Sequence, residues 1–459
     1  MIAFRAGRYA TRQHINWPGN CFVSAKKKKD AEASGYDPFE ERDNPHPTTY
    51  SETLAHLLKS ALGTGILGMP IAFLYSGYIL GIFATILTAV ICTHCAYVLV
   101  QCAHKLYFRL KLTKLTYGEV AEVTLINGPQ WSKKFALPLK YIILVCVFLT
   151  YFGTCSVYTV IVAKNIQQVY EYFMDTEINL RILIAAMLIP NILLAWVPNL
   201  KYLAPVSIIA NIFMGLGLSI TMYYLVQDIP PVSDKVMANP LRLPAFFSIA
   251  IFAMEAIGVV MPLENNMKNP RQFIGIFGIL DIGMSIIALI YMVLGLLGYL
   301  RYGDQTEQSI TLNLPVEEVP AQMVKVLIAA AVYGTFGLQF YVCLEIAWDG
   351  IKNKCQKRPL IANYVLRTVL VTAAVLLAIA VPTIAPFMGL IGAFCFSILG
   401  IIVPIFIETI IYWDEGFGKC HWIVWKNVLV SIFGVGALFF GTHSAITEIV
   451  ELYTKGGSS

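Results

Sequence analysis

The sequence predicts an all-α polytopic membrane protein, and two observations support this fold class. First, hydrophobic residues make up 57% of the 459 residues and charged residues only 13%, whereas a soluble chain carries about 25% charged residues. Second, the charge deficit is concentrated in long runs such as 141–162, 282–300 and 365–381, and about 20 apolar residues cross a bilayer as a helix. The N-terminus is polar and has no apolar core segment, so we expect no signal peptide.

Residues 1–50 are expected to form a disordered cytosolic tail. The segment is polar and contains four consecutive lysines at 26–29, followed by several prolines, and a segment of this composition cannot bury enough apolar surface to fold. The basic run could contact anionic lipid, although a solvated tail is the simpler interpretation. A cytosolic signalling partner could also dock on this tail.

Eleven apolar segments are expected to cross the membrane. They are residues 53–74, 78–103, 139–163, 180–197, 204–226, 246–263, 275–300, 321–346, 361–381, 386–411 and 428–446. The loops between them alternate in charge, and the basic ones are residues 105–134, 268–271, 352–358 and 419–426. Because cytosolic loops carry the excess of Lys and Arg, we expect a cytosolic N-terminus and a short extracellular or lumenal C-terminal tail at 448–459.

The first apolar segment contains a predicted break in its helix. Gly63, Gly65 and Gly68 weaken the helical preference, and Pro70 removes a backbone donor. A broken helix at membrane depth exposes N–H and C=O groups, which is tolerated only where those groups are buried in protein or line a cavity. The break is therefore a predicted binding site for a small polar solute.

A matching interruption is expected in the sixth segment. Like the first segment, it has a glycine in its middle, Gly258, and a Met-Pro pair near its end, and five segments precede it. Interrupted helices at corresponding positions of two halves indicate an inverted-repeat transporter. The alternative is two ordinary kinked helices, since Gly and Pro are common in membrane spans. On the first interpretation, the membrane domain 51–447 contains a first repeat at 51–226, a second repeat at 244–411 and an extra helix at 427–447.

Ionisable side chains within spans are costly and usually functional. His56 and Lys59 lie one turn apart ahead of the first break, and Glu255 is the carboxylate deepest in a span, about one turn before Gly258. Histidine titrates near pH ~6.5 and can exchange a proton at physiological pH. His56 is therefore a candidate proton-coupling residue, with a hydrogen-bonded packing histidine as the alternative.

Other kinds of site find little support in the sequence. Residues 63–68 match the dinucleotide fingerprint G-x-G-x-x-G, but that motif requires a preceding strand and an acidic residue about 20 positions later, and neither is seen here. Phosphate-loop, zinc-protease and nucleophile-elbow motifs are absent, so we expect no enzyme, no cofactor and no nucleic-acid partner. Metal-like spacing is disfavoured as well, because cysteine on a membrane helix is usually a small apolar filler. It is found at Cys92, His94, Cys95, Cys102 and His104.

Three stretches resemble one known family. Residues 56–70, 252–271 and 309–315 are similar to the proton-coupled amino acid transporters of the amino acid/auxin permease superfamily, and the resemblance extends over residues 53–446. It implies eleven helices, the first ten of them arranged as the leucine-transporter-type (LeuT) inverted repeat. It also implies proton-linked or uniport movement of small amino acids, with His56 at the position of a family histidine linked to proton coupling.

The resemblance implies a zwitterionic substrate at the two breaks. Backbone N–H groups of residues 64–67, at the start of a half-helix, are expected to bind its carboxylate, and carbonyls of residues 252–256 to bind its ammonium group. Gly65 and Gly258 are expected to leave room for its side chain. The predicted substrate-binding residues are Gly63, Thr64, Gly65, Ile66, Leu67, Phe252, Glu255 and Gly258, and the predicted proton-coupling residue is His56.

The favoured function is secondary active transport of small amino acids across a membrane, with protons as the coupling ion. The alternatives are a high-affinity uniporter and an amino acid sensor, or transceptor, that is linked to growth signalling and moves little substrate. A channel is disfavoured because no ring of like charges or repeated filter motif is visible. The plasma membrane and the late endosome or lysosome both stay open as locations. Some relatives have a disulfide-bonded cysteine where Val316 and Glu317 follow Pro315, so that disulfide cannot form here.

Overall fold

The computed structural model describes residues 37–44, 47–198, 200–227, 229–254, 256–354 and 356–456. Apart from one isolated β-bridge, the regular structure of these residues is helical. The α-helices are α2 (Tyr50–Ala61), α3 (Met69–Ser76), α4 (Tyr78–Leu110), α5 (Tyr117–Ile126), α6 (Ala136–Met174), α7 (Leu180–Ala186), α8 (Leu188–Ala195), α9 (Leu200–Val226), α10 (Leu243–Met254), α11 (Ile257–Asn266), α12 (Ile279–Tyr302), α13 (Val319–Ile351), α14 (Pro359–Ala380), α15 (Ala385–Ile391), α16 (Val403–Ile411), α17 (Trp422–Gly436) and α18 (Thr442–Gly456). The shorter elements used below are the 3₁₀ helices η2 (Thr64–Gly68) and η8 (Ile310–Asn313) and the π-helical segment η9 (Gly392–Ile402).

Nine helical segments of the described chain are long and apolar enough to span a bilayer. The pair formed by α2 and η2–α3, bent by 45° at a short break, makes a tenth. These segments confirm an all-α polytopic membrane protein, and they fall on ten of the eleven predicted spans. The other predicted span forms the apolar helix Leu180–Ala195, which at 1.5 Å per residue is about 24 Å long and shorter than the ~30 Å hydrocarbon core. The total of eleven spans therefore stays a prediction.

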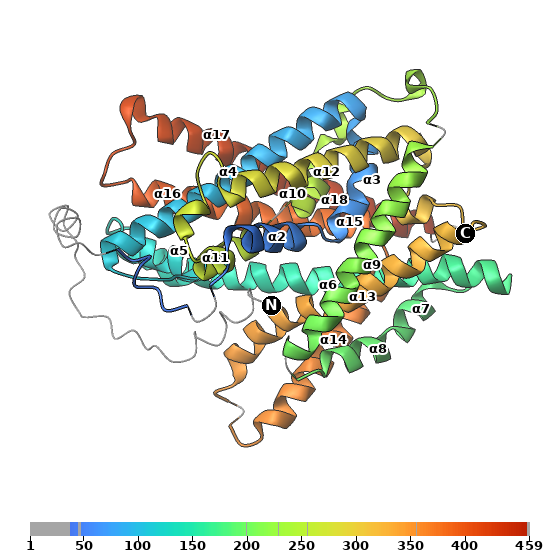
Figure 1. The fold of residues 1–459 in the computed structure, drawn as a ribbon, viewed down its shortest axis with the longest axis horizontal. Coiled ribbons are helices and arrows are strands. Elements are labelled where there is room, and N and C mark those ends of the chain that lie inside the picture. The colour runs from blue at the N-terminus through green and yellow to red at the C-terminus, as the bar shows by residue number, and fades with distance from the viewer. Residues whose placement is uncertain are drawn as a thin grey trace.

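The two interrupted segments lie in the middle of the bundle (Figure 1). α10 packs against α3, α4 and α15, and α12 packs against α2, α3 and α4, whereas α6, α9, α13 and α14 pack together on the other side. Glycines permit the close approach of α12 to α3. A Cβ atom on Gly295 would lie 2.6 Å from Phe73 Cδ2, and one on Gly298 would lie 2.6 Å from Pro70 Cγ. Small residues have this role at many helix contacts within membranes, and here they hold α3 between α10 and α12.

The predicted break in the first segment is confirmed. α2 begins with a capping box, in which Thr49 and Glu52 exchange side chain–backbone hydrogen bonds. It ends at Ala61, because the next residue, Leu62, has a non-helical ψ of 62°, and Gly63 is extended with φ −99° and ψ −155°. The chain then forms η2 and α3, with Pro70 in the first turn of α3, where a missing N–H costs no intrahelical hydrogen bond. The unwound residues are therefore Leu62 and Gly63.

The sixth predicted segment is also interrupted. α10 ends at Met254 and α11 begins at Ile257, preceded by Ala256 at φ −115° and ψ 0°. Glu255 lies outside the described residues. Pro262 lies inside α11 and does not end it. Since the last carbonyls of a helix and the first N–H groups of the next have no intrahelical partner, this interruption also presents backbone polar groups inside the bundle.

A segment that precedes α2, called the strap here (residues 37–44 and 47–49), is held against the end of α11. Arg42 donates to the Glu264 carboxylate (Nη2–Oε1 2.8 Å), to the Glu264 carbonyl (3.0 Å) and to the Thr113 carbonyl (2.7 Å). The exposed fraction is 3% for the Arg42 side chain and 0% for that of Glu264. His104 of α4 lies 2.8 Å from the same carboxylate. A buried ionic cluster thus ties the strap to α4 and α11.

The strap lies within the segment expected to be a disordered tail, and the structure corrects that expectation for its residues. Thr48 forms backbone hydrogen bonds of 2.9 Å with both Asn266 and Lys268, and Asp37 pairs with Arg271 at 2.5 Å. The physical reason is that Arg42 finds a buried carboxylate 222 positions away in the chain. Composition does not reveal a partner at that distance.

Replacing Arg42 with alanine is expected to lower the free energy of unfolding by about 3 kcal/mol. This is the low end of the cost of removing one partner of a buried ion pair, because Glu264 keeps His104 as a neighbour. Arg271→Ala is the matched control, since its side chain is 61% exposed and exposed pairs contribute about 1 kcal/mol or less. Thermal unfolding of the purified protein in detergent measures both, and equal losses for the two variants would contradict the buried anchor.

Candidate functional site at the two helix breaks

The two interrupted segments touch each other. A Cβ atom on Gly65 would lie 2.6 Å from Ala253 Cα and 3.0 Å from Ala253 Cβ, and one on Gly68 would lie 2.5 Å from Met388 Cε. Every residue of η2 is buried, including Thr64, Ile66 and Leu67. The expected room for a substrate side chain beside Gly65 is therefore filled by α10, and the glycine permits backbone contact between the two segments.

Polar side chains from three other helices surround the first break. Gln339 of α13 donates from Nε2 to the Tyr158 hydroxyl of α6 at 3.2 Å, and Tyr158 also interacts with the Thr64 side chain. Tyr291 of α12 donates from its hydroxyl to the carbonyl of Ala61, the last residue of α2. These side chains supply donors and acceptors next to the unwound residues, as a site for a small polar molecule requires.

Helix-end backbone groups lie at both breaks. No side chain caps the start of η2, so its first N–H groups lack the partner that a capping residue would supply. At the other break, the carbonyls of Phe252 and Ala253 belong to the last turn of α10, where intrahelical donors run out. Phe252 itself is buried and its ring lies 6.1 Å from that of Phe396. Donors at one break and acceptors at the other suit a ligand that carries a negative and a positive group.

One face of α6 lines both breaks. A Cβ atom on Gly258 would lie 3.0 Å from the Tyr151 hydroxyl, and one on Gly63 would lie 4.0 Å from the Tyr158 hydroxyl. Tyr151 and Tyr158 are seven residues apart, about two helical turns, and so lie on the same side of α6. Gly258 is exposed and Gly63 is half-buried. The space around these two glycines is thus the accessible part of the site.

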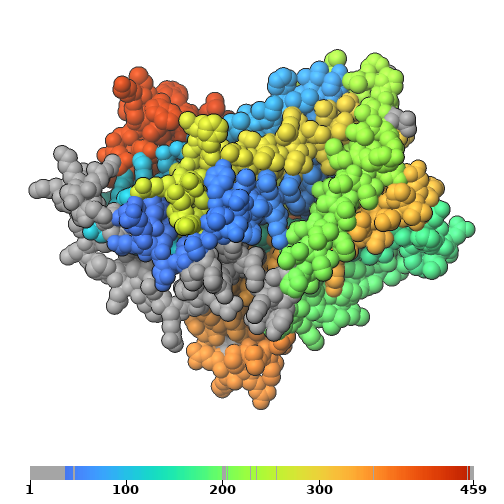
Figure 2. Space-filling model, viewed as in Figure 1, coloured from blue at the N-terminus to red at the C-terminus, as the bar shows by residue number. Residues whose placement is uncertain are grey.

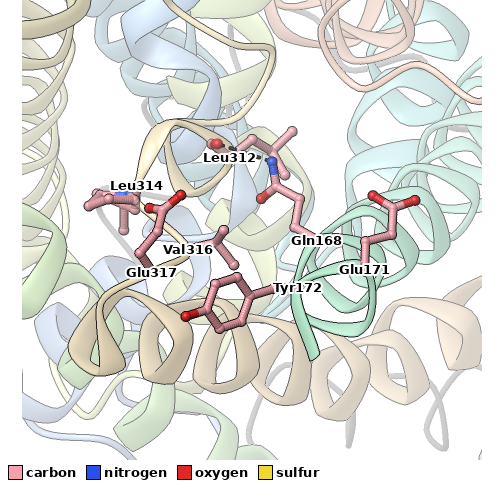
Figure 3. Close-up of a pocket in the computed structure, with 8 residues that line it drawn as sticks. Gln168, Glu171, Tyr172, Leu312, Leu314, Val316 and Glu317 are labelled. Carbon is pink, nitrogen blue, oxygen red and sulfur yellow. Dashed lines mark hydrogen bonds between the residues drawn. The ribbon is translucent and has the colours of Figure 1, made fainter. Parts of the chain in front are cut away.

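The opposite side of the site is sealed by the loop that contains η8, which contacts η2. Lys325 of α13 is fully buried and donates from Nζ to the Gln168 side chain (2.8 Å) and to the Thr311 carbonyl (2.7 Å). Gln168 in turn donates to the Leu312 carbonyl at 3.2 Å, as the dashed line in Figure 3 shows. Gln308 accepts from Lys164 (3.2 Å) and from the Ile384 backbone (2.8 Å). We call this hydrogen-bonded group the cap; it consists of Lys164, Gln168, Gln308, Thr311, Leu312, Lys325 and Ile384.

Outside the cap lies a hollow of about 380 Å³. Glu171 and Tyr172 of α6 stand on one side of it, and Glu317 and Val316 of the loop before α13 stand on the other (Figure 3). Its two carboxylates make it acidic, and the hydrogen-bonded Gln168 and Leu312 of the cap also line it. It is therefore a surface depression beside the cap.

His56 lies on α2, seven residues before Gly63, or about 10 Å along the helix. It is half-buried, and its charged neighbours are Lys59 and Glu52. No described residue forms a hydrogen bond with its ring, so the structure does not show the hydrogen-bonded packing histidine of the alternative interpretation. Its role in proton coupling stays a prediction, and so does any role of Glu255, which lies outside the described residues.

Three residues of this site are missing from the sequence-based prediction: Tyr158, Gln339 and Tyr291. Each is a polar side chain inside a segment of spanning length, and such side chains usually face the bundle interior. That signal could have identified Gln339, whereas tyrosine is too common near membrane interfaces to be distinctive. Among the described residues, no group of His, Cys, Asp and Glu side chains could hold a metal ion.

Gly65→Ala is expected to destabilise the protein by about 1–3 kcal/mol, the usual cost of overpacking, because the new methyl group meets the backbone of Ala253. Gly258→Ala is the matched control, since its methyl group meets only the end of the Tyr151 side chain. The melting temperature and the monodispersity of the two purified variants in detergent measure the difference. A Gly65→Ala protein as stable as Gly258→Ala would show that the two segments are not in contact.

Comparison with known proteins identifies the family. Residues 46–447 match the model of a family described as transmembrane amino acid transporter protein. The chain is 65% identical over 433 residues to the proton-coupled amino acid transporter-like protein pathetic of Drosophila melanogaster, covering 94% of this chain and 92% of that protein. It is 25% identical over 429 residues to the amino acid transporter AVT3C of Arabidopsis thaliana, covering 89% and 93%. The chain therefore belongs to the transmembrane amino acid transporter family, whose members are transporters rather than enzymes.

Proposed function

We propose that this protein is a secondary active transporter that moves small amino acids together with protons. The observation that carries the proposal is the contact between two interrupted helices at Gly65 and Ala253, with uncapped N–H groups on one side and helix-end carbonyls on the other. The name of the Drosophila relative, a proton-coupled amino acid transporter-like protein, supports the same assignment.

The two breaks suit the two charges of an amino acid. Its carboxylate binds at the start of η2, where Thr64 and the following N–H groups meet the positive end of a half-helix. Its ammonium group binds near the carbonyls of Phe252 and Ala253, at the negative end of α10. Tyr158 and Gln339 complete the site from α6 and α13. The space beside Gly258 receives the substrate side chain, because Gly65 is already covered by Ala253.

The positions of the breaks support a LeuT-type inverted repeat. They fall in the first and sixth predicted spans, with four predicted spans between them, which is the spacing that two repeats of five helices require. The breaks occur on α2/α3 and on α10/α11, and these elements lie together in the centre of the molecule (Figure 1). In such folds one set of helices rocks against the other around the bound substrate.

The structure fits a state of the transport cycle in which the substrate site is open on the side of α2. Ser60 and Gly258 are exposed and Gly63 is half-buried, whereas residues 64–70 are buried beneath the cap. To open the other side, the cap must release its hydrogen bonds from Lys325 and Lys164. By the charge of the loops, the open side is cytosolic and the cap is extracellular or lumenal, which fits a carrier that takes up substrate and protons from an acidic exterior or lumen.

One observation favours an amino acid sensor as a second function. The strap is tied through Arg42 to Glu264 in α11, and the other end of this ten-residue helix is the second break. A change of α11 on substrate binding would therefore reach the N-terminal segment. Uptake of labelled amino acid by proteoliposomes that contain the purified protein separates the two functions, since a sensor would bind the amino acid while accumulating little of it.

His56→Ala is expected to remove the dependence of uptake on pH between 5 and 8, the range over which histidine normally titrates, while binding of the amino acid persists. Protonation of His56 about 10 Å before the break would favour substrate binding, and the coupling between proton and substrate must be reciprocal. A tenfold effect on affinity needs only about 1.4 kcal/mol. Proteoliposome uptake with and without an imposed pH gradient measures it. Wild-type uptake that is indifferent to pH would make the protein a uniporter.

Tyr158→Phe is expected to weaken substrate binding by about fivefold to tenfold, the loss of roughly one hydrogen bond. The variant removes the hydroxyl that contacts Gln339 and Thr64 and keeps the ring that packs around them. The concentration for half-maximal uptake measures the effect. Tyr333→Phe is the control, because that hydroxyl donates to the Pro190 carbonyl away from the breaks. Equal effects of the two substitutions would contradict the placement of the site.

A further inference from the structure

The cap contains a buried lysine that is held by neutral groups alone. Lys325 is 0% exposed, and its two acceptors are the Gln168 side chain at 2.8 Å and the Thr311 carbonyl at 2.7 Å. No carboxylate of the described residues forms an ion pair with it. Burying an ammonium group is costly unless a carboxylate pairs with it. The contacts that Lys325 makes in the closed cap therefore offset only part of the cost of burying its charge.

A carboxylate without a hydrogen bond lies close to this lysine. The charged neighbour of Lys325 is Glu317, which lines the acidic hollow outside the cap together with Gln168 (Figure 3). Glu317 is exposed, and no described residue donates a hydrogen bond to its carboxylate. Glu171, the other carboxylate of the hollow, already accepts from a glutamine side chain and from a backbone N–H group. Glu317 is therefore the carboxylate of the hollow that is available to a lysine.

The position of Lys325 on α13 brings both sets of partners within its range. It lies six residues after the start of the helix, about 9 Å along the axis, and the start of α13 reaches the surface beside α9 (Figure 2). Long side chains of a helix lean toward its N-terminus, where Glu317 lies, and a lysine ammonium is carried by a flexible four-carbon stem. Rotation of this stem, with a shift of the short loop between η8 and α13, exchanges one set of partners for the other.

We infer that Lys325 is a positioning residue with two alternative sets of partners: bound to Gln168 and Thr311 it holds the cap closed, and bound to Glu317 it holds the cap open. Because η8 contacts η2, release of Thr311 uncovers the first break from the side of the cap. The closed arrangement has two hydrogen bonds from a desolvated ammonium, whereas the open one has an ion pair and a hydrated ammonium, so the gains offset each other. A two-state element requires such a balance. The inference rests on the proposed function, since a carrier needs the cap to open.

The reactivity of a cysteine beneath the cap measures how often the cap opens. Ile310 of η8 is 0% exposed, so Ile310→Cys in the full chain, purified in detergent, should react with a maleimide only when the cap opens. Mass spectrometry of its peptide separates this label from that on native cysteines. Gln168→Leu removes one acceptor of the closed arrangement and is expected to raise the labelling rate about tenfold. Glu317→Gln removes the partner of the open arrangement and is expected to lower the rate about fivefold.

Two comparisons separate this switch from a lysine that is merely structural. Glu177→Gln, at an exposed carboxylate that does not line the hollow, is the matched control and should leave the rate unchanged. In a Lys325→Gln background, Glu317→Gln should have no further effect, because the ion pair that it breaks is already absent.

The inference is overturned if Glu317→Gln leaves the rate unchanged or raises it, if it acts equally in both backgrounds, or if Gln168→Leu fails to raise the rate in a folded protein. Should Lys325→Gln fail to fold, the two single substitutions still decide. The labelling requires neither an amino acid nor a pH gradient. Absence of amino acid uptake by the reconstituted wild-type protein would therefore contradict the proposed function, and the labelling rates would still report on the cap.

Discussion

A polypeptide that breaks a helix inside a bilayer must enclose the freed backbone groups in protein, since the hydrocarbon core offers no water to bind them. This constraint shapes the centre of the molecule. Gly65 and Ala253 are in backbone contact, so each interrupted segment shields the other, and α12 closes on α3 through Gly295 and Gly298. The backbone groups at the start of η2 and the end of α10 then lie inside the bundle.

Ionic and polar clusters hold the two ends of this core by different means. At the end of α11, the buried pair of Arg42 and Glu264 joins three separate parts of the chain, and His104 adds a fourth contact. On the opposite side, the buried Lys325 has only neutral partners, a glutamine side chain and a backbone carbonyl. Hydrogen bonds from a lysine to neutral acceptors are weaker than a buried ion pair with several hydrogen bonds. The strap is thus the firmer of the two attachments, and the cap is the side that can be released.

α4 connects three features of the molecule. Its His94 and Tyr97 line a hollow between α4 and α12, while His104 and Tyr107, ten residues or about three turns further on, contact Glu264 and Asn265 beneath the strap. The same helix packs against α10, which carries the second break. α4 is one continuous helix of 33 residues, so these three features share a single element.

The sequence by itself determined the fold class, the position of the first break and the family, because these depend on local composition and on long stretches of similar residues. Apolar runs identify membrane helices wherever they pack, and the three glycines and the proline between Gly63 and Pro70 disfavour an uninterrupted α-helix. Only the tertiary structure decided what each residue of the site does. Gly65 proved to be a packing contact with Ala253, and Tyr158, Gln339 and Tyr291 joined the site from helices whose sequences do not mark them. The same holds for Arg42, which composition assigned to a disordered tail and a carboxylate 222 residues away holds in place, because contacts between distant parts of the chain leave no periodic signal in the sequence.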